Sequence, residues 1–159
     1  MNFTGISGRF ASPVEAAFEI KDEVKKRFGF TVNIGISDVK VLAKMASDFE
    51  KPDRVHTLFR KEIQEKMWPL PISDLFMAGH FSVETLRKLE IQTIGDLAKA
   101  DPKLIELHLK SHGRRLWEFA NGMDDSIVES EKAEAKGVGN STTLSKDVST
   151  KEDAQKVLL

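Results

Sequence analysis

The chain has 159 residues, of which 40% are hydrophobic and 31% charged, and its formal net charge is −1. These values fit an ordinary globular chain of one domain, or of two small domains that share a boundary. The absence of cysteine excludes disulfides, cysteine-ligated zinc, iron–sulfur clusters and thiol catalysis. No apolar run approaches the roughly 18 residues of a membrane span, and the near-zero charge excludes a uniformly basic coat for nucleic acid.

The first patterned segment predicts a helix followed by a strand. Ser12 can cap a helix whose first turn contains Pro13 and Glu15, and Gly29 supplies a C-terminal stop. Apolar and polar residues then alternate over 30–36, which predicts a β-strand. We therefore expect the chain to pass from a helix directly into a strand.

A second helix and a second strand are expected next. Apolar residues recur at helical spacing over 37–51, and Pro52 ends this helix. Residues 55–59 are a candidate for a short strand. The order helix–strand–helix–strand over residues 1 to about 59 predicts a fragment of an α/β layer.

Beyond residue 59 the pattern is helical only, interrupted by Gly and Pro as far as residue 122. Ser82 is expected to cap one of these helices, with a hydrophobic staple between Phe81 and Leu86. Gly113 is expected to separate the last two helices. The expected helical segments are 63–68, a single turn at 72–76, one helix that starts at Ser82, and helices at 94–100 (capped by Thr93), 102–110 (opened by Asp101 and Pro102) and 114–121.

A short connector between two of these helices contains Met77, Ala78, Gly79, His80 and Phe81. A helix–hairpin–helix of this kind can aim backbone N–H groups and a helix N-terminus at one phosphate, so that it binds nucleic acid without reading bases. The alternative is a plain αα-hairpin within a helical bundle, which is the simpler interpretation of the connector taken alone.

Two lysines suggest a second phosphate contact. Lys44 and Lys51 lie two helical turns apart in the second expected helix, and such a pair could clamp a triphosphate. The simpler interpretation is an i,i+4 ion pair between Lys44 and Asp48 on a solvated helix face.

The histidines do not predict a metal site. His108 and His112 lie one helical turn apart, but a metal would need further ligands and no supporting motif is present. The segment His112, Gly113, Arg114 and Arg115, at an expected helix start, instead predicts a second contact of backbone and cations with phosphate.

Motifs of other chemistries are missing from the sequence. We find no nucleophile motif, Walker loop or dinucleotide fingerprint. The glycines at 137–140 lack the preceding strand and following helix that a phosphate loop requires. Asp124 and Asp125 could hold a metal in principle, but a turn or a helix cap is the simpler interpretation.

Taken together, several segments in a fixed order resemble Y-family DNA polymerases of the DinB/UmuC (impB/mucB/samB) type. The resemblance covers nearly the whole chain and favours phosphate binding both for the connector and for the two lysines. It implies an α+β/α fold, with a partial α/β palm flank at 1–66, an all-helical thumb with a helix–hairpin–helix at 67–126, and a linker plus the start of a little-finger domain at 127–159. The segments are 33–37 (Asn-Ile-Gly-Ile-Ser), 41–48, 51–52, 68–72 (Trp-Pro-Leu-Pro-Ile), 93–97, 120–126 (Ala-Asn-Gly-Met-Asp-Asp-Ser) and 137–144.

The chain also departs from this family. Family members run two-metal phosphoryl transfer on three carboxylates, an Asp in the first strand and the Asp-Glu of a Ser-Ile-Asp-Glu motif, and these motifs are missing here. The family's tyrosine at the nucleotide site is missing too, and Met77 stands where a Gly-x-Gly hairpin has its first glycine. We therefore expect a fragment without the N-terminal catalytic half and most of the little finger, with no polymerase activity by itself. No catalytic residue, metal or cofactor is expected in this chain, because Mg²⁺ belongs to the intact polymerase.

The resemblance also implies binding partners and a cellular location. Primer–template DNA is the expected partner. In the intact enzyme, Lys51 and Lys44 would keep a vestigial contact with the triphosphate of an incoming nucleotide. A sliding clamp would bind through regions outside this sequence. We expect a bacterial cytoplasmic protein without membrane contact, acting on damaged DNA in translesion synthesis, DNA repair and the SOS response. An unpaired edge of strand 30–36 predicts self-association. The alternatives are a non-catalytic, sequence-independent DNA-binding helix–hairpin–helix module and an inert structural remnant.

Overall fold

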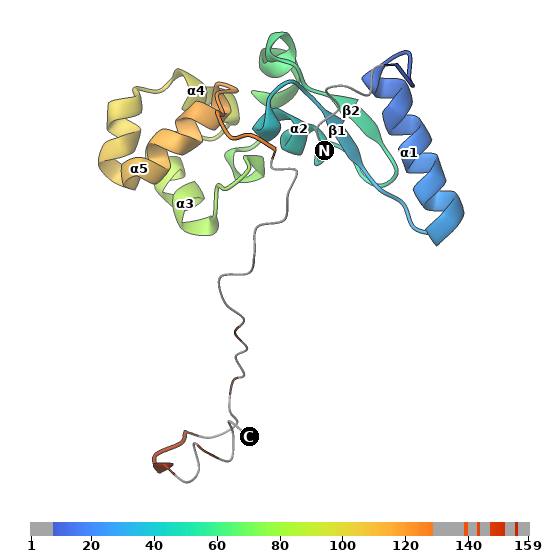
Figure 1. The fold of residues 1–159 in the computed structure, drawn as a ribbon. Helices are drawn as coiled ribbons and strands as arrows, with labels where there is room; N and C mark the ends of the chain where they lie inside the picture. The colour runs from blue at the N-terminus through green and yellow to red at the C-terminus, as the bar shows by residue number, and fades with distance from the viewer. Residues whose placement is uncertain (1–7, 129–138, 140–142, 144–146, 152–154, 156–159) are drawn as a thin grey trace.

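The first half of the fold is a parallel strand–helix–strand unit with one more helix beside it (Figure 1). The computed structural model describes residues 8–128, 139, 143, 147–151 and 155. The elements of this half are α1 (Pro13–Phe28), β1 (Ile34–Ile36), α2 (Lys40–Ala46) and β2 (Val55–Thr57). The two strands pair in parallel, Ile34 with Val55 and Ile36 with Thr57, and α2 is the crossover that a parallel pair requires. The predicted order helix–strand–helix–strand is confirmed.

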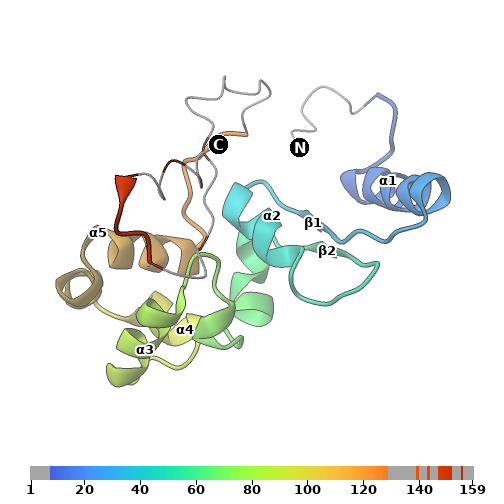
Figure 2. The same cartoon turned by 90° about the horizontal axis from the view of Figure 1, so that it is seen from below.

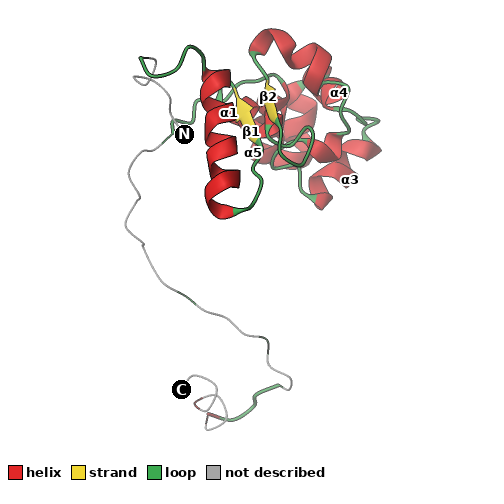
Figure 3. Ribbon diagram, turned by 90° about the vertical axis from the view of Figure 1, so that its right-hand side faces the viewer, coloured by secondary structure: helices red, strands yellow, loops and turns green. Residues whose placement is uncertain are grey.

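Helix α1 has the ends that the sequence predicts. The Ser12 hydroxyl accepts a hydrogen bond from the Glu15 N–H at 3.1 Å, and the helix ends at Gly29 with a φ of 74°. Glycine adopts this left-handed conformation without steric cost. The helix lies against both strands (Figure 3) and is tied to the turn before β2, where Asp53 binds Lys21 at 3.1 Å and Lys25 at 3.0 Å.

The two strands and the second helix of this half are shorter than predicted. The strand expected over 30–36 pairs only over 34–36, because its partner β2 begins after the turn that Asp53 makes with a φ of 62°. The helix expected over 37–51 ends at Ala46, where the Ser47 hydroxyl donates to a carbonyl of the last turn. The outer edge of β1 has no partner strand among the described residues, and self-association through it stays a prediction.

The second half is helical, as predicted, and its helices lie together on one side of the strand–helix–strand unit (Figure 2). Thr93 and Asp96 form the capping box of one helix, and Asp101 with Pro102 opens another. Both predicted helix starts are confirmed. The elements are η1 (Arg60–Glu62), η2 (Ile63–Met67), η3 (Ile72–Asp74), α3 (His80–Lys88), α4 (Ile94–Lys99) and α5 (Pro102–Ala120).

The predicted cap of α3 is wrong. The helix starts at His80 with Gly79 as its N-cap, so Ser82 lies buried inside the first turn. Phe81 is 73% exposed and forms no staple with the fully buried Leu86. The physical reason is Met77, whose φ of 68° turns the chain earlier than the sequence pattern indicated.

The predicted break in the last helix is also displaced. Lys110, with φ 54° and ψ −146°, interrupts α5, and the helix resumes at Ser111. Gly113 is instead a site of close approach, because a Cβ there would lie 2.7 Å from the Ile105 carbonyl oxygen. His108 and His112 therefore lie on either side of a break and do not share one helix face.

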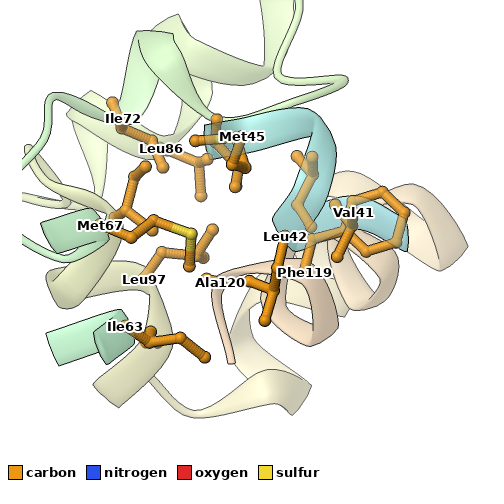
Figure 4. Packing of buried hydrophobic residues seen from close by; sticks show 14 of the residues in the cluster. Val41, Leu42, Met45, Ile63, Met67, Ile72, Leu86, Leu97, Phe119 and Ala120 are labelled. Atoms are coloured by element: carbon orange, nitrogen blue, oxygen red, sulfur yellow. The ribbon is translucent and has the colours of Figure 1, made fainter. Parts of the chain in front are cut away.

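One hydrophobic core joins the two halves (Figure 4). Leu42 and Met45 of α2 belong to the same cluster as Met67 and Leu97 of the helical half. The predicted division at 66/67 therefore crosses a shared core, and the division itself stays a prediction. Most of the predicted linker and little-finger start at 127–159 lies outside the described residues. Within the described part of the chain, no helix is both long enough and apolar enough to cross a bilayer.

Gly35→Ala should strongly destabilise the protein. A Cβ at Gly35 would lie 1.9 Å from the Ala43 carbonyl oxygen and 2.5 Å from the Ser47 nitrogen, so α2 would have to move away from β1. We expect the free energy of unfolding to fall by about 3 kcal/mol, the upper range for overpacking, in urea titrations. Gly8→Ala is the control, since a Cβ there meets no atom within 4 Å. Equal midpoints for the two variants would refute the close approach.

Candidate nucleic-acid interface

The first predicted phosphate contact is a tight turn that leads into α3. The Ala78 N–H donates to the Leu75 carbonyl oxygen at 2.9 Å, and the Gly79 N–H donates to the Met77 carbonyl oxygen at 3.0 Å. Gly79 has an extended backbone and no side chain of the described residues caps α3. The first N–H groups of α3, including those of His80 and Phe81, are therefore without an intrahelical acceptor and available to an anion.

The second predicted contact lies at the restart of α5. Arg114 and Arg115 are exposed, whereas Gly113 is buried. The Arg114 Nε donates to Glu118 at 2.9 Å, and the Arg115 guanidinium lies 5.5 Å from the centre of the Phe119 ring. The predicted segment 112–115 therefore does occupy a helix start, which Ser111 begins one residue earlier.

An aromatic stack brings the two segments together. The rings of Phe76 and Phe119 are stacked with centroids 6.2 Å apart, and Arg115 lies over the Phe119 ring. Phe76 directly precedes the first turn, and its N–H donates to the Met45 sulfur at 3.3 Å. The turn before α3 and the restarted part of α5 are therefore linked through the Phe119 ring, and the two predicted segments 77–81 and 112–115 are together called the hairpin surface below.

The two lysines meet at one carboxylate. Lys51 binds the Asp48 carboxylate at 2.7 Å, and Lys44 forms the i,i+4 pair with the same group. Hydrogen bonds from Lys44 and Lys51 hold the pKa of Asp48 below its ordinary value. Lys51 lies beyond the end of α2, so the predicted shared helix face is wrong, but the side chains still converge. A triphosphate would have to displace Asp48 from both ammonium groups.

Asp124 is a helix cap, as the simpler interpretation held. Its carboxylate accepts hydrogen bonds from the Val41 N–H of α2 at 3.1 Å and from the Ser126 N–H at 3.0 Å. Burial alone would raise the pKa of Asp124, but these hydrogen bonds and the nearby Lys40 lower it below its ordinary value. No group of three or more His, Asp or Glu suited to a metal ion occurs among the described residues.

Arg60 is a residue that the sequence did not single out. It lies in η1 and lines a hollow together with Ser111, Arg114 and Arg115 of α5 and with residues 123–126. No local pattern marks Arg60, because its neighbours in the hollow come from segments far along the chain. Only the fold brings it beside the second predicted contact.

Comparisons with known proteins show which proteins this chain resembles. Residues 1–48 match the model of the impB/mucB/samB family. DNA polymerase IV of Clostridium acetobutylicum is 47% identical over 146 residues, which are 92% of this chain and 37% of that protein. The chain is related to the Y-family DNA polymerases of the DNA polymerase IV type. It spans little more than a third of the length of this curated relative.

Solved structures of related polymerases share the fold. A DinB family error-prone DNA polymerase from Sulfolobus solfataricus gives a TM-score of 0.68 at 26% identity, over 80% of this chain and 38% of that one. A ternary complex of Dbh with partially disordered substrates gives a TM-score of 0.64 at 25% identity, over 79% of this chain and 38% of that one. The mixed α/β half followed by helices is therefore an arrangement found in Y-family polymerases.

Met77→Gly should stabilise the protein or leave it unchanged. A non-glycine residue with a φ of 68° carries a steric cost of about 1 kcal/mol, and Met77 is half exposed, so little packing is lost. Ala78→Gly is the matched control, because Ala78 has no positive φ. We expect this variant to lower the free energy of unfolding by about 0.5–1 kcal/mol. Urea midpoints measure both variants. A loss for Met77→Gly equal to that of Ala78→Gly would contradict the left-handed turn.

Asp124→Asn should lower the free energy of unfolding near neutral pH but not in acid. Because the folded pKa of Asp124 is lowered, its carboxylate stabilises the fold above the ordinary pKa, and this contribution is lost as the pH falls below about 4. We expect a loss of about 1 kcal/mol at pH 7, as for other helix caps, that shrinks towards pH 3. Asp125→Asn removes the same charge from the neighbouring exposed residue. Parallel pH profiles of stability for both variants would rule out the cap.

Proposed function

We propose that the chain binds primer–template DNA through the sugar–phosphate backbone, as the thumb-containing part of a translesion DNA polymerase. The observation that carries this proposal is the hairpin surface, where Phe76, next to the turn that leads into the uncapped helix α3, stacks on the Phe119 ring over which the Arg115 guanidinium lies. Backbone N–H groups and guanidinium groups are the donors that proteins most often direct at phosphate oxygens. The relation to DNA polymerase IV supplies a ligand with such oxygens.

Binding of this kind does not depend on base sequence. Every nucleotide presents the same phosphate to an N–H group or an arginine, whereas reading a base requires contacts to base edges in a groove. The few cations at the hairpin surface also predict modest affinity and a shallow salt dependence, since each neutralised phosphate adds about 0.9 to the log–log slope. The two segments of the hairpin surface, 77–81 and 112–115, are the proposed phosphate contacts.

The nucleotide contact is proposed only for the intact enzyme. Lys51, assisted by Lys44, would bind the triphosphate of an incoming nucleotide after releasing Asp48. The residues described here do not fit a Mg²⁺ centre, because their carboxylates form no cluster of three. We therefore expect DNA binding rather than nucleotide transfer from this chain by itself.

Fluorescence anisotropy with a labelled primer–template, titrated with salt, tests the proposal. We expect equal affinity for two duplexes of unrelated sequence and a slope of about −1 to −3. Arg115→Gln should reduce this slope by about one, because it removes one phosphate contact. Arg9→Gln is the control, since it removes the same charge next to α1 at the opposite flank of the molecule (Figure 1).

Two outcomes would overturn the proposal. If Arg115→Gln and Arg9→Gln reduce the affinity for DNA equally, the total positive charge of the chain, and not the hairpin surface, attracts the DNA. Absence of binding at low salt would favour an inert structural remnant, which the internal pairing of Arg114 with Glu118 and of both lysines with Asp48 would then explain.

A further inference from the structure

The hollow next to α5 collects cations from separate parts of the chain. Arg60 comes from η1, whereas Arg114 and Arg115 come from the restarted half of α5. The hydroxyl-bearing residues Ser111 and Ser126 also line it. Arg60 precedes the helical core elements and Ser126 follows them, so a ligand in the hollow would contact three segments that only the fold brings together.

Two of the three acidic residues of the hollow already form an ion pair or hydrogen bonds within the protein. Glu118 pairs with Arg114, and both oxygens of Asp124 already accept backbone N–H groups. Arg60 and Arg115 form no ion pair with any described residue, and Arg115 is held in place over the Phe119 ring. Asp125 is exposed and forms no ion pair in the same part of the chain. Asp124 forms no ion pair with a described residue either, so two guanidinium groups and two carboxylates without an ion pair line the hollow, and Asp124 already accepts two backbone N–H groups.

We propose that this hollow binds a phosphate group of the DNA backbone, with Arg60 and Arg115 as its charged ligands. The inference rests on the proposed DNA binding and extends it to a site and to a residue outside the two predicted segments. Planar guanidinium groups offer paired N–H donors that match phosphate oxygens, and the Ser111 hydroxyl can donate to a remaining oxygen. A phosphate bound by both arginines would also link η1 to α5.

Arg60→Gln and Lys61→Gln form a matched pair of variants. Both residues are exposed neighbours of equal charge without an ion pair among the described residues, but only Arg60 lines the hollow. In salt titrations of primer–template binding, we expect Arg60→Gln to weaken binding three- to tenfold at low salt and to reduce the slope by about one. Lys61→Gln should change both quantities much less. Circular dichroism checks that both variants keep the fold.

A second measurement separates a DNA phosphate from a free phosphate. Nuclear magnetic resonance of the arginine Nε–H groups follows Arg60 and Arg115 during titration with the duplex or with inorganic phosphate. We expect both signals to shift when the duplex is added. Inorganic phosphate at the same total concentration of phosphate groups should leave both signals unchanged. Equal shifts with inorganic phosphate would assign the hollow to a free anion and overturn the DNA site.

The remaining outcomes distinguish the two proposals. If the duplex binds and Arg60→Gln behaves like Lys61→Gln, the hollow is not a phosphate site, while DNA binding by the hairpin surface stands. If the wild-type chain does not bind the duplex at low salt, both proposals fail together.

Discussion

The packing of α2 against both halves of the molecule is the constraint on which the rest of the structure depends. On one side the helix lies so close to β1 that only glycine fits at position 35. On the other side Leu42 and Met45 are fully buried in the core shared with the helical half. A helix of seven residues has little stability of its own, so these two contacts, together with the Asp124 cap, hold it in place.

The hairpin surface inherits its geometry from this packing. Two contacts hold Phe76 in place. Its backbone N–H donates to the Met45 sulfur of α2, and its ring stacks on the Phe119 ring of α5. The next residue, Met77, then adopts a left-handed backbone that glycine would adopt more easily. The surrounding contacts therefore impose the turn. Helix α3 has no side-chain cap because its N-cap residue is Gly79, which has no side chain, so the uncapped amides result from core packing and local sequence together.

The sequence predicts the helix ends that neighbouring residues determine, and it misses those that depend on contacts between distant segments. The starts of α1, α4 and α5 were predicted because Ser12, Thr93 and Asp101 lie next to the N–H groups that they cap. The start of α3 and the break at Lys110 were not, since non-glycine residues with positive φ carry no local signal. In the candidate site, residues 77–81 and 112–115 were predicted from their local sequence and stay a prediction, whereas the link between them through Phe76 and Phe119 required the fold.

Internal ion pairing decides how the charges of this chain act. Asp48 pairs with both Lys44 and Lys51, Asp53 pairs with both Lys21 and Lys25, and Glu118 pairs with Arg114, so each of these carboxylates cancels one positive charge beside it and weakens the outward field. A net charge of −1 would argue against a polyanionic ligand only if these charges acted together at long range. At contact distance the unpaired guanidinium groups and free amides dominate, because screening limits the remaining charges to about 10 Å at 0.1 M salt. The proposed recognition of DNA therefore depends on a few directed phosphate contacts.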